Sequence, residues 1–106
     1  MASISTNQDI VTLINVFTVS PENQQRLVDL LVEATESVIC KQPGYVSANI
    51  HKSLDGTKVT NYAQWRSIED FQRMLGNEEA RTHMKEAEGL ATVEPQLYAV
   101  SYTHEI

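Results

Sequence analysis

Cross-linking and metal-binding residues are scarce in this chain of 106 residues, which contains one cysteine and three histidines. Cys40 has no second cysteine to pair with, so an internal disulfide bond is excluded. The sequence also lacks an HExxH motif and any close grouping of cysteine, histidine and carboxylate residues typical of a metal site. A single free cysteine suits a reducing compartment, and we therefore expect a cytoplasmic protein without a metal.

Positive charge is scarce too, since eight lysine and arginine residues stand against 14 aspartate and glutamate residues, for a net charge of −6. Without a basic cluster, the chain lacks the electrostatic footprint that binds nucleic acid or an anionic membrane. No apolar run approaches the roughly 18 residues needed to cross a bilayer. The sequence therefore favours a small neutral ligand or another protein as its partner.

What the chain does contain is enough hydrophobic sequence, 42% of its residues, for one small core. The polar start MASISTNQ predicts a disordered tail over residues 1–9, followed by a single domain over residues 10–106. Segments rich in β-branched or alternating apolar residues predict strands, and apolar residues at helical spacing predict helices between them. The predicted strands are 10–19, 45–52, 58–65 and 95–104, and the predicted helices are 21 to about 40, 68 to about 75, and 78–89.

Capping residues and turn signals support these boundaries. Ser20 and Pro21 are typical of a helix start, and the Asp55-Gly56 pair is typical of a hairpin turn. In SIED, Ser67 is placed to cap the short helix with Asp70 as its partner. The order β-α-β-β-α-β predicts an α+β protein with a ferredoxin-like sandwich, a four-stranded antiparallel sheet with helices on one face.

Side-chain alternation in the third predicted strand, KVTNYAQW, places Asn61 and Trp65 on one face and Tyr62 on the other. The face with Asn61 is the more apolar, so we expect it beneath the helices. Asn15 occupies an equivalent position on the first strand. Two explanations are open for these amides: they hydrogen-bond to each other, to backbone or to a buried water, or they line a cavity and orient a ligand.

The stretch PGYVSANIHKSLDGTKVTNYAQWRSIEDF, and DGT and NYAQW within it, resembles the antibiotic biosynthesis monooxygenase family, most closely its actinorhodin-type quinone-forming members. The resemblance implies a homodimer whose sheets pack together, with a pocket in each subunit between sheet and helices. It further implies oxidation of an aromatic phenol or anthrone to a quinone by O2, without metal, flavin or haem. Asn61 and Trp65 match the family's catalytic asparagine and tryptophan.

The resemblance and the predicted helix faces together suggest further substrate contacts. Phe71 stands where the actinorhodin-type pattern has a tyrosine, so it can pack against a ring but cannot donate a hydrogen bond. Lys85 stands at the position of the family's arginine and keeps the charge without the planar fork. The expected substrate contacts are Asn15, Phe71, Met74, His83 and Lys85.

His83 shares a helical face with Ala80 and Ala87, so it is either a pocket residue with a base near physiological pH or a partly exposed helix histidine. In the family's haem-degrading branch, a histidine from this helix and an asparagine from the first strand serve haem. His83 and Asn15 match those places, but Met74 stands near the position of that branch's tryptophan. The resemblance therefore implies that the protein uses no cofactor, with haem as the alternative.

Three functions follow from these residues. The first is the cofactor-independent monooxygenase. The second is another enzyme on the same scaffold, which either degrades haem or isomerises a small metabolite. The third is a non-catalytic dimeric module for binding or stress response. For the sheet face without helices, alternation predicts an exposed row that a second subunit would cover. The predicted row is Tyr62, Tyr98, Val100 and Tyr102.

Overall fold

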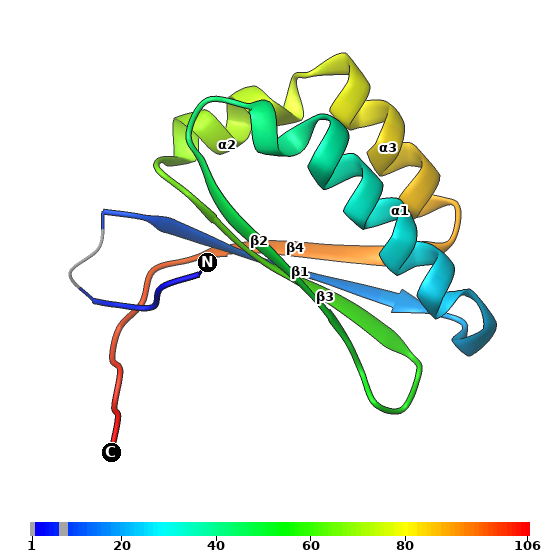
Figure 1. The fold of residues 1–106 in the computed structure, drawn as a ribbon, viewed down its shortest axis with the longest axis horizontal. Helices are drawn as coiled ribbons and strands as arrows, with labels where there is room; N and C mark the ends of the chain where they lie inside the picture. Colours follow the sequence, from blue (N-terminus) through cyan, green and yellow to red (C-terminus); the bar gives the residue numbers. More distant parts are fainter. Residues whose placement is uncertain (1, 7–8) are drawn as a thin grey trace.

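The computed structural model describes residues 2–6 and 9–106, which fold into one four-stranded antiparallel sheet and a layer of helices. The strands are β1 (Val11–Val19), β2 (Tyr45–Lys52), β3 (Lys58–Trp65) and β4 (Ala91–Tyr98), in the order β2-β3-β1-β4. The helices α1 (Gln24–Ser37), α2 (Ile68–Leu75) and α3 (Glu78–Glu88) lie on the same side of the sheet (Figure 1). The predicted ferredoxin-like α+β sandwich is confirmed.

The first helical region is divided into three pieces, whereas one helix was predicted. Short 3₁₀ helices, Pro21–Asn23 and Ile39–Lys41, flank α1. Ser20 makes no capping hydrogen bond with its side chain. Instead, the buried Gln24 amide donates to the backbone oxygens of Ser53 and Lys58, 3.0 Å from each. These bonds fasten the start of α1 to the β2–β3 hairpin.

The fourth strand was predicted wrongly at both ends, because it begins at Ala91 and stops at Tyr98. Pro95, taken as the start of the strand, lies within it opposite Asn15. A proline is tolerated there because β4 is an edge strand. It pairs with β1 on one side, so the N–H that proline lacks leaves no second strand without a hydrogen bond. Beyond Tyr98 the chain leaves the sheet and runs away from it (Figure 1).

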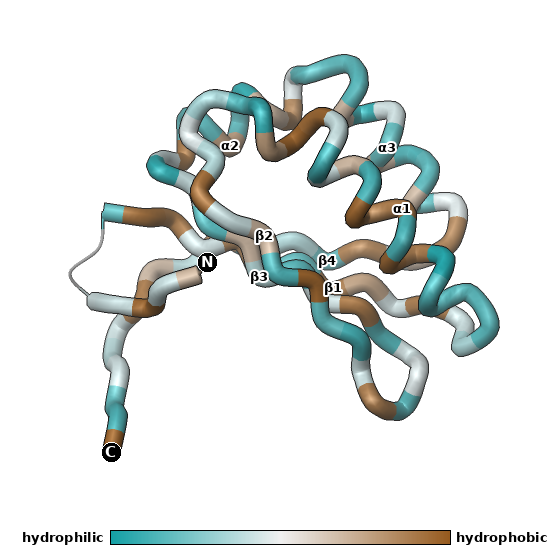
Figure 2. The backbone as a smooth tube through the Cα atoms, viewed as in Figure 1, coloured by the Kyte–Doolittle hydropathy of each residue, from teal (hydrophilic) through white to brown (hydrophobic). Residues whose placement is uncertain are grey.

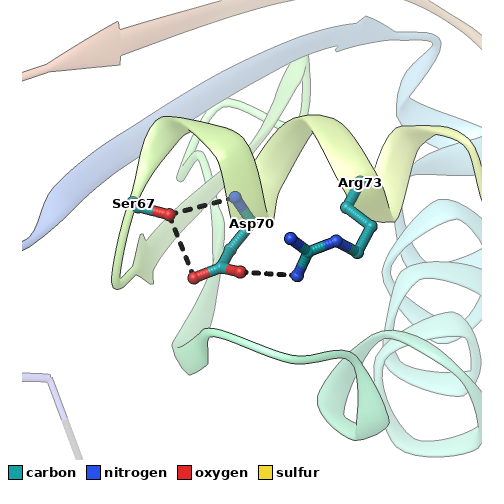
Figure 3. Close-up of polar contacts among 3 residues, drawn as sticks. All are labelled: Ser67, Asp70 and Arg73. Carbon is teal, nitrogen blue, oxygen red and sulfur yellow. Dashed lines mark hydrogen bonds and ion pairs between the residues drawn. The ribbon is translucent and has the colours of Figure 1, made fainter.

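The helices α2 and α3 begin where the capping residues predicted. The Ser67 hydroxyl accepts from the Asp70 backbone N–H at 3.0 Å and donates to the Asp70 carboxylate at 3.0 Å, and Arg73 donates to the same carboxylate at 2.9 Å (Figure 3). At the next helix, the Asn77 side chain accepts from the Ala80 N–H at 2.9 Å. The short loop after Trp65 therefore turns β3 directly into the helix above it.

The core lies between the sheet and the helices. Hydrophobic and hydrophilic residues alternate along α1, as expected for a helix with one apolar face (Figure 2). That face buries Leu27, Ala34 and the adjoining Val38. Two groups of buried side chains result, one around Trp65 and one around Phe17.

Near the N-terminus, Ser3 contacts the sheet face that carries no helix. Its backbone N–H donates to the Gln64 side chain at 3.4 Å, and its carbonyl accepts from the same side chain at 2.7 Å. The predicted disordered tail over residues 1–9 includes Met1, Asn7 and Gln8, which lie outside the described residues. The limits of the tail and of the domain over residues 10–106 stay predictions.

Candidate active site

A cavity of about 440 Å³ lies between the inner face of the sheet and the three helices. Its walls are mainly apolar and come from all four strands and all three helices. The exposed residues Leu75, Glu88 and Gln96 contribute to its lining, so the cavity reaches the surface beside the edge strand β4. A mainly apolar chamber with a few polar groups is typical of a site for a small organic ligand.

Asn15 and Asn61 are asparagines on the inner face of the sheet that line this cavity. They are directly opposite each other on the neighbouring strands β1 and β3. The Oδ1 atom of each is buried and has no hydrogen-bond partner among the described residues. An unpaired buried acceptor costs about 1–3 kcal/mol, so a pair of them facing one cavity favours a ligand that donates hydrogen bonds. The missing partners agree with the ligand-orienting explanation for the amides, which stays a prediction.

Trp65 forms a wall of the cavity and is held between two other rings. Only 1% of its surface is exposed. The Tyr45 ring meets it edge to face with centroids 5.8 Å apart, and the Phe71 ring meets it at 6.1 Å. Burial, with a smaller contribution from nearby Cys40, raises the pKa of the Tyr45 phenol above its ordinary value. The indole is therefore held in one orientation in the wall of the cavity by the two neighbouring rings.

Four of the five residues expected to contact a substrate lie at the cavity, and the fifth does not. Asn15, Phe71, Met74 and His83 line the cavity, and their contact with a substrate stays a prediction. Lys85 does not line it and lies on the exposed side of α3. Its neighbour Met84 lines the cavity instead, because consecutive helical residues are turned about 100° from each other. The structure does not support Lys85 as a substrate contact.

Sequence reasoning missed the contribution of α1 and of the first residue of β2. Leu31, Ala34 and Thr35 on α1 line the cavity, and so does Tyr45. The apolar face of α1 had been recognised, but a core face and a cavity wall have the same spacing in sequence. Alternation along β2 would have placed Val46, not Tyr45, on the inner face with Ala48. A shift of register between Tyr45 and Ser47 brings Tyr45 opposite Trp65 instead, and simple alternation does not predict such a shift.

Metal-binding groups are not gathered at the cavity. Within residues 2–6 and 9–106, no cluster of three or more histidine, cysteine or carboxylate side chains is placed to hold a metal ion. The same residues contain no helix with the length and hydropathy needed to span a bilayer.

Comparison with known proteins decides the family. Residues 10–86 match the antibiotic biosynthesis monooxygenase family, in agreement with the resemblance noted in the sequence. The tetracenomycin-F1 monooxygenase of Streptomyces glaucescens is 43% identical over 103 residues, which are 97% of this chain and 92% of that protein. This chain belongs to the antibiotic biosynthesis monooxygenase family. The prediction of a monooxygenase is confirmed.

Solved structures of two oxygenases have the same fold. The monooxygenase from ActVA-Orf6 of Streptomyces coelicolor, in complex with the ligand nanaomycin D, has a TM-score of 0.80 and 25% identity, covering 97% of this chain and 99% of that one. SnoaB from Streptomyces nogalater, a cofactor-independent oxygenase, has a TM-score of 0.74 and 26% identity, covering 90% and 96%. Both relatives match nearly the full length of the domain described above.

Proposed function

We propose that this chain oxidises a polycyclic phenol or anthrone of the polyketide type to a quinone with O2, without metal, flavin or haem. The observation that carries the proposal is the pair of amide oxygens, on Asn15 and Asn61, that have no partner among the described residues and belong to a mainly apolar cavity also lined by Trp65. The relatives support it, since one is a tetracenomycin-F1 monooxygenase and another was crystallised with nanaomycin D.

The reaction needs no external reductant. An anthrone CH2 group loses its two hydrogens and gains one oxygen atom, the second oxygen atom leaves as water, and the substrate supplies all four electrons. The substrate must first lose a proton, because its anion transfers an electron to O2 more readily than the neutral molecule. The protein therefore has to bind the ring system, favour its anion and keep water away from the intermediates.

The cavity provides these three conditions. Trp65 and Phe71 offer flat apolar surfaces for the rings. The side chains of Asn15 and Asn61 combine an acceptor for a substrate hydroxyl with an amide N–H that is able to donate to the oxyanion. The helices cover the chamber, so charge that develops on the substrate oxygen interacts with these amides in a medium of low polarity.

Oxygen consumption by purified protein tests the proposal. Protein treated with a chelator and free of flavin and haem is offered anthrones and dihydroxynaphthalenes, and O2 uptake and quinone absorbance are followed together. We expect uptake by the wild type and a fall of about 10²–10³-fold for Asn61→Ala, the usual effect of removing an oxyanion donor. Trp65→Phe should bind substrate more weakly. Uptake no faster than in buffer for every compound would contradict the proposal.

Haem titration separates the haem-degrading alternative from the proposed function. His83 and Asn15, the residues matched to that branch, both line the cavity. A stable haem complex with a Soret band, lost in His83→Ala, followed by haem breakdown on addition of a reductant, would favour that alternative. The proposed function predicts no such complex.

The biological unit in the proposal is a cytoplasmic homodimer formed by the sheet faces without helices, and nucleic acid and membrane are not partners. The supporting observation is that all three helices cover the opposite face (Figure 1). Tyr62 and Tyr98 point to the uncovered face, and Tyr98 is 48% exposed. Val100 and Tyr102, expected on the same face, follow the end of β4 and are not part of the sheet, which corrects that prediction.

Sedimentation velocity tests the dimer. The wild type should sediment as a dimer, and Tyr62→Glu should sediment as a folded monomer because the dimer would bury an unpaired carboxylate from each subunit. Glu33→Gln, a change at an exposed position of α1 on the opposite side of the sheet, is the control. A wild-type monomer at all concentrations would exclude the dimer.

A further inference from the structure

The buried core is interrupted by a polar layer at the level of the two asparagines. Along β1, Asn15 lies between Leu13 of the core group around Trp65 and Phe17 of the second group. Along β3, Asn61 lies between Ala63 of the first group and Val59 of the second. Each strand thus places one amide where the two apolar groups meet.

The helix above the sheet repeats this pattern. Ala80 on α3 belongs to the core group around Trp65, and Ala87 belongs to the group around Phe17. They are 0% and 2% exposed, so the face of α3 that carries them is turned toward the sheet. His83 is three residues after Ala80 and four before Ala87, on that same face. It is half-buried, lines the cavity and forms no hydrogen bond with another described residue.

We propose that the His83 imidazole is the general base of the reaction and accepts the proton of the substrate hydroxyl held beside Asn15 and Asn61. The inference rests on the proposed function, because it assigns the proton acceptor for that substrate. The O–H bond of the phenol, or of the enol form of the anthrone, breaks, an N–H bond forms on the imidazole, and the electron pair stays on the substrate oxygen. The imidazolium formed in this way remains next to the oxyanion and stabilises it.

Other titratable side chains at the cavity suit this task less well. Within the described residues, the lining contains two besides His83, namely Tyr45 from β2 and Glu88 from α3, while α1, α2, β1, β3 and β4 supply none. A tyrosine that remains protonated near neutral pH is a donor and not a base. Glu88 is exposed at the end of α3, beyond the buried Ala87 and away from the polar layer. His83 lines the cavity from the buried face of α3, and a neutral imidazole carries one ring nitrogen that is able to accept a proton.

The proton transfer is measurable without the oxidation. In an O2-free solution, 1,8-dihydroxyanthrone is added to the protein at a pH where the free compound is neutral, and its absorbance reports whether the bound form is the anion. We expect the anion in the wild type and the neutral compound in His83→Gln, which keeps a polar side chain without a base. His51→Gln, a change at an exposed histidine of β2, is the matched control and should behave as the wild type.

Turnover in the presence of O2 provides the second readout. We expect kcat to fall about 10²–10⁴-fold in His83→Ala and His83→Gln, the usual contribution of a general base. Added imidazole should restore part of the rate in His83→Ala, and raising the pH should restore both variants as the substrate ionises by itself. A variant with a structural defect alone would show neither recovery.

The outcomes separate this inference from the proposed function. Anion formation that depends on His83, without O2 uptake above background, would support the base and refute the oxidation. Uptake by His83→Gln with the kcat and pH profile of the wild type would overturn the base and leave the proposed function standing. If circular dichroism shows that both variants are unfolded, the absorbance assay is decided on the wild-type protein alone. Wild-type protein that binds 1,8-dihydroxyanthrone in its neutral form at every pH below the pKa of the free compound would overturn the inference.

Discussion

Replacing Asn61 with leucine should change stability and activity in opposite directions. Leucine has nearly the shape of asparagine and carries no polar atoms. The Asn61 Oδ1 atom is buried without a hydrogen-bond partner among the described residues, so the ligand-free protein bears the cost of desolvating it. Asn61→Leu removes that cost and also removes the group proposed to hold the substrate oxygen.

The size of the effect follows from the cost of an unpaired acceptor, about 1–3 kcal/mol. Leucine also keeps the contacts with its neighbours in the two core groups. We therefore expect the free energy of unfolding to rise by about 1–2 kcal/mol, which is roughly 4–8 °C in Tm for each kcal/mol in a domain of this size. The rate of substrate oxidation should fall by about 10²–10³-fold.

Urea unfolding followed by tryptophan fluorescence and circular dichroism measures the first change, and O2 uptake measures the second. Gln64→Leu is the matched control, because Gln64 is also a buried amide on β3 but accepts from Ser47 at 3.0 Å and exchanges bonds with Ser3. That variant should lose about 1 kcal/mol or more, since it leaves a buried partner unpaired.

A loss of stability in Asn61→Leu as large as in Gln64→Leu would refute this reasoning. It would mean that the Asn61 amide is satisfied within the folded protein, and that its role is structural. An unchanged rate of oxidation would separately remove Asn61 from the site.

Three further predictions concern the turns and the helix α3. Gly44→Ala should destabilise the protein by more than about 1 kcal/mol in the urea assay, because Gly44 has a φ of +86° and an added Cβ would overlap a side chain of α2. Gly76→Ala is the control and should be nearly neutral, because φ is −84° there. Hydrogen bonds from Thr57 lower the pKa of Asp55 from 3.8 to about 2, so its contribution to stability is present above pH 3.8 and is lost as the pH falls toward 2. The difference in unfolding free energy between wild type and Asp55→Asn should therefore shrink over that range, and a constant difference would contradict it. Lys85→Ala should leave kcat and KM unchanged, because Lys85 is exposed and away from the cavity; a fall in kcat/KM of tenfold or more would return it to the site.

Alternation and capping made the centre of the fold predictable. The pattern of KVTNYAQW alone placed Asn61 and Trp65 on the face beneath the helices, and the observed register confirms it. Ser67 predicted the turn from strand to helix, because its side chain offers the hydrogen bond that the first turn lacks. These are local rules, and tertiary contacts did not override them.

The fourth strand and the phase of α3 were not predictable in the same way. A proline disrupts a central strand but is acceptable in an edge strand such as β4, which contains Pro95. Whether a strand lies at the edge depends on the order of all the strands, which the local sequence does not reveal. Lys85 and Met84 differ by one residue, yet one is exposed and the other lines the cavity. The match of Lys85 to a family position does not reveal how α3 is rotated about its own axis. That rotation is fixed by the packing of Ala80 and Ala87 against the sheet.

Oxygen-isotope labelling tests the central claim most directly. Protein free of metal, flavin and haem is given an anthrone under 18O2 in ordinary water, and the quinone is examined by mass spectrometry at short times, before its carbonyl oxygens exchange with solvent. A monooxygenase that needs no cofactor predicts one 18O atom in each quinone molecule, formed at a rate that depends on Asn61. A quinone without 18O, accompanied by one H2O2 for each O2 consumed, would identify an oxidase and contradict the account.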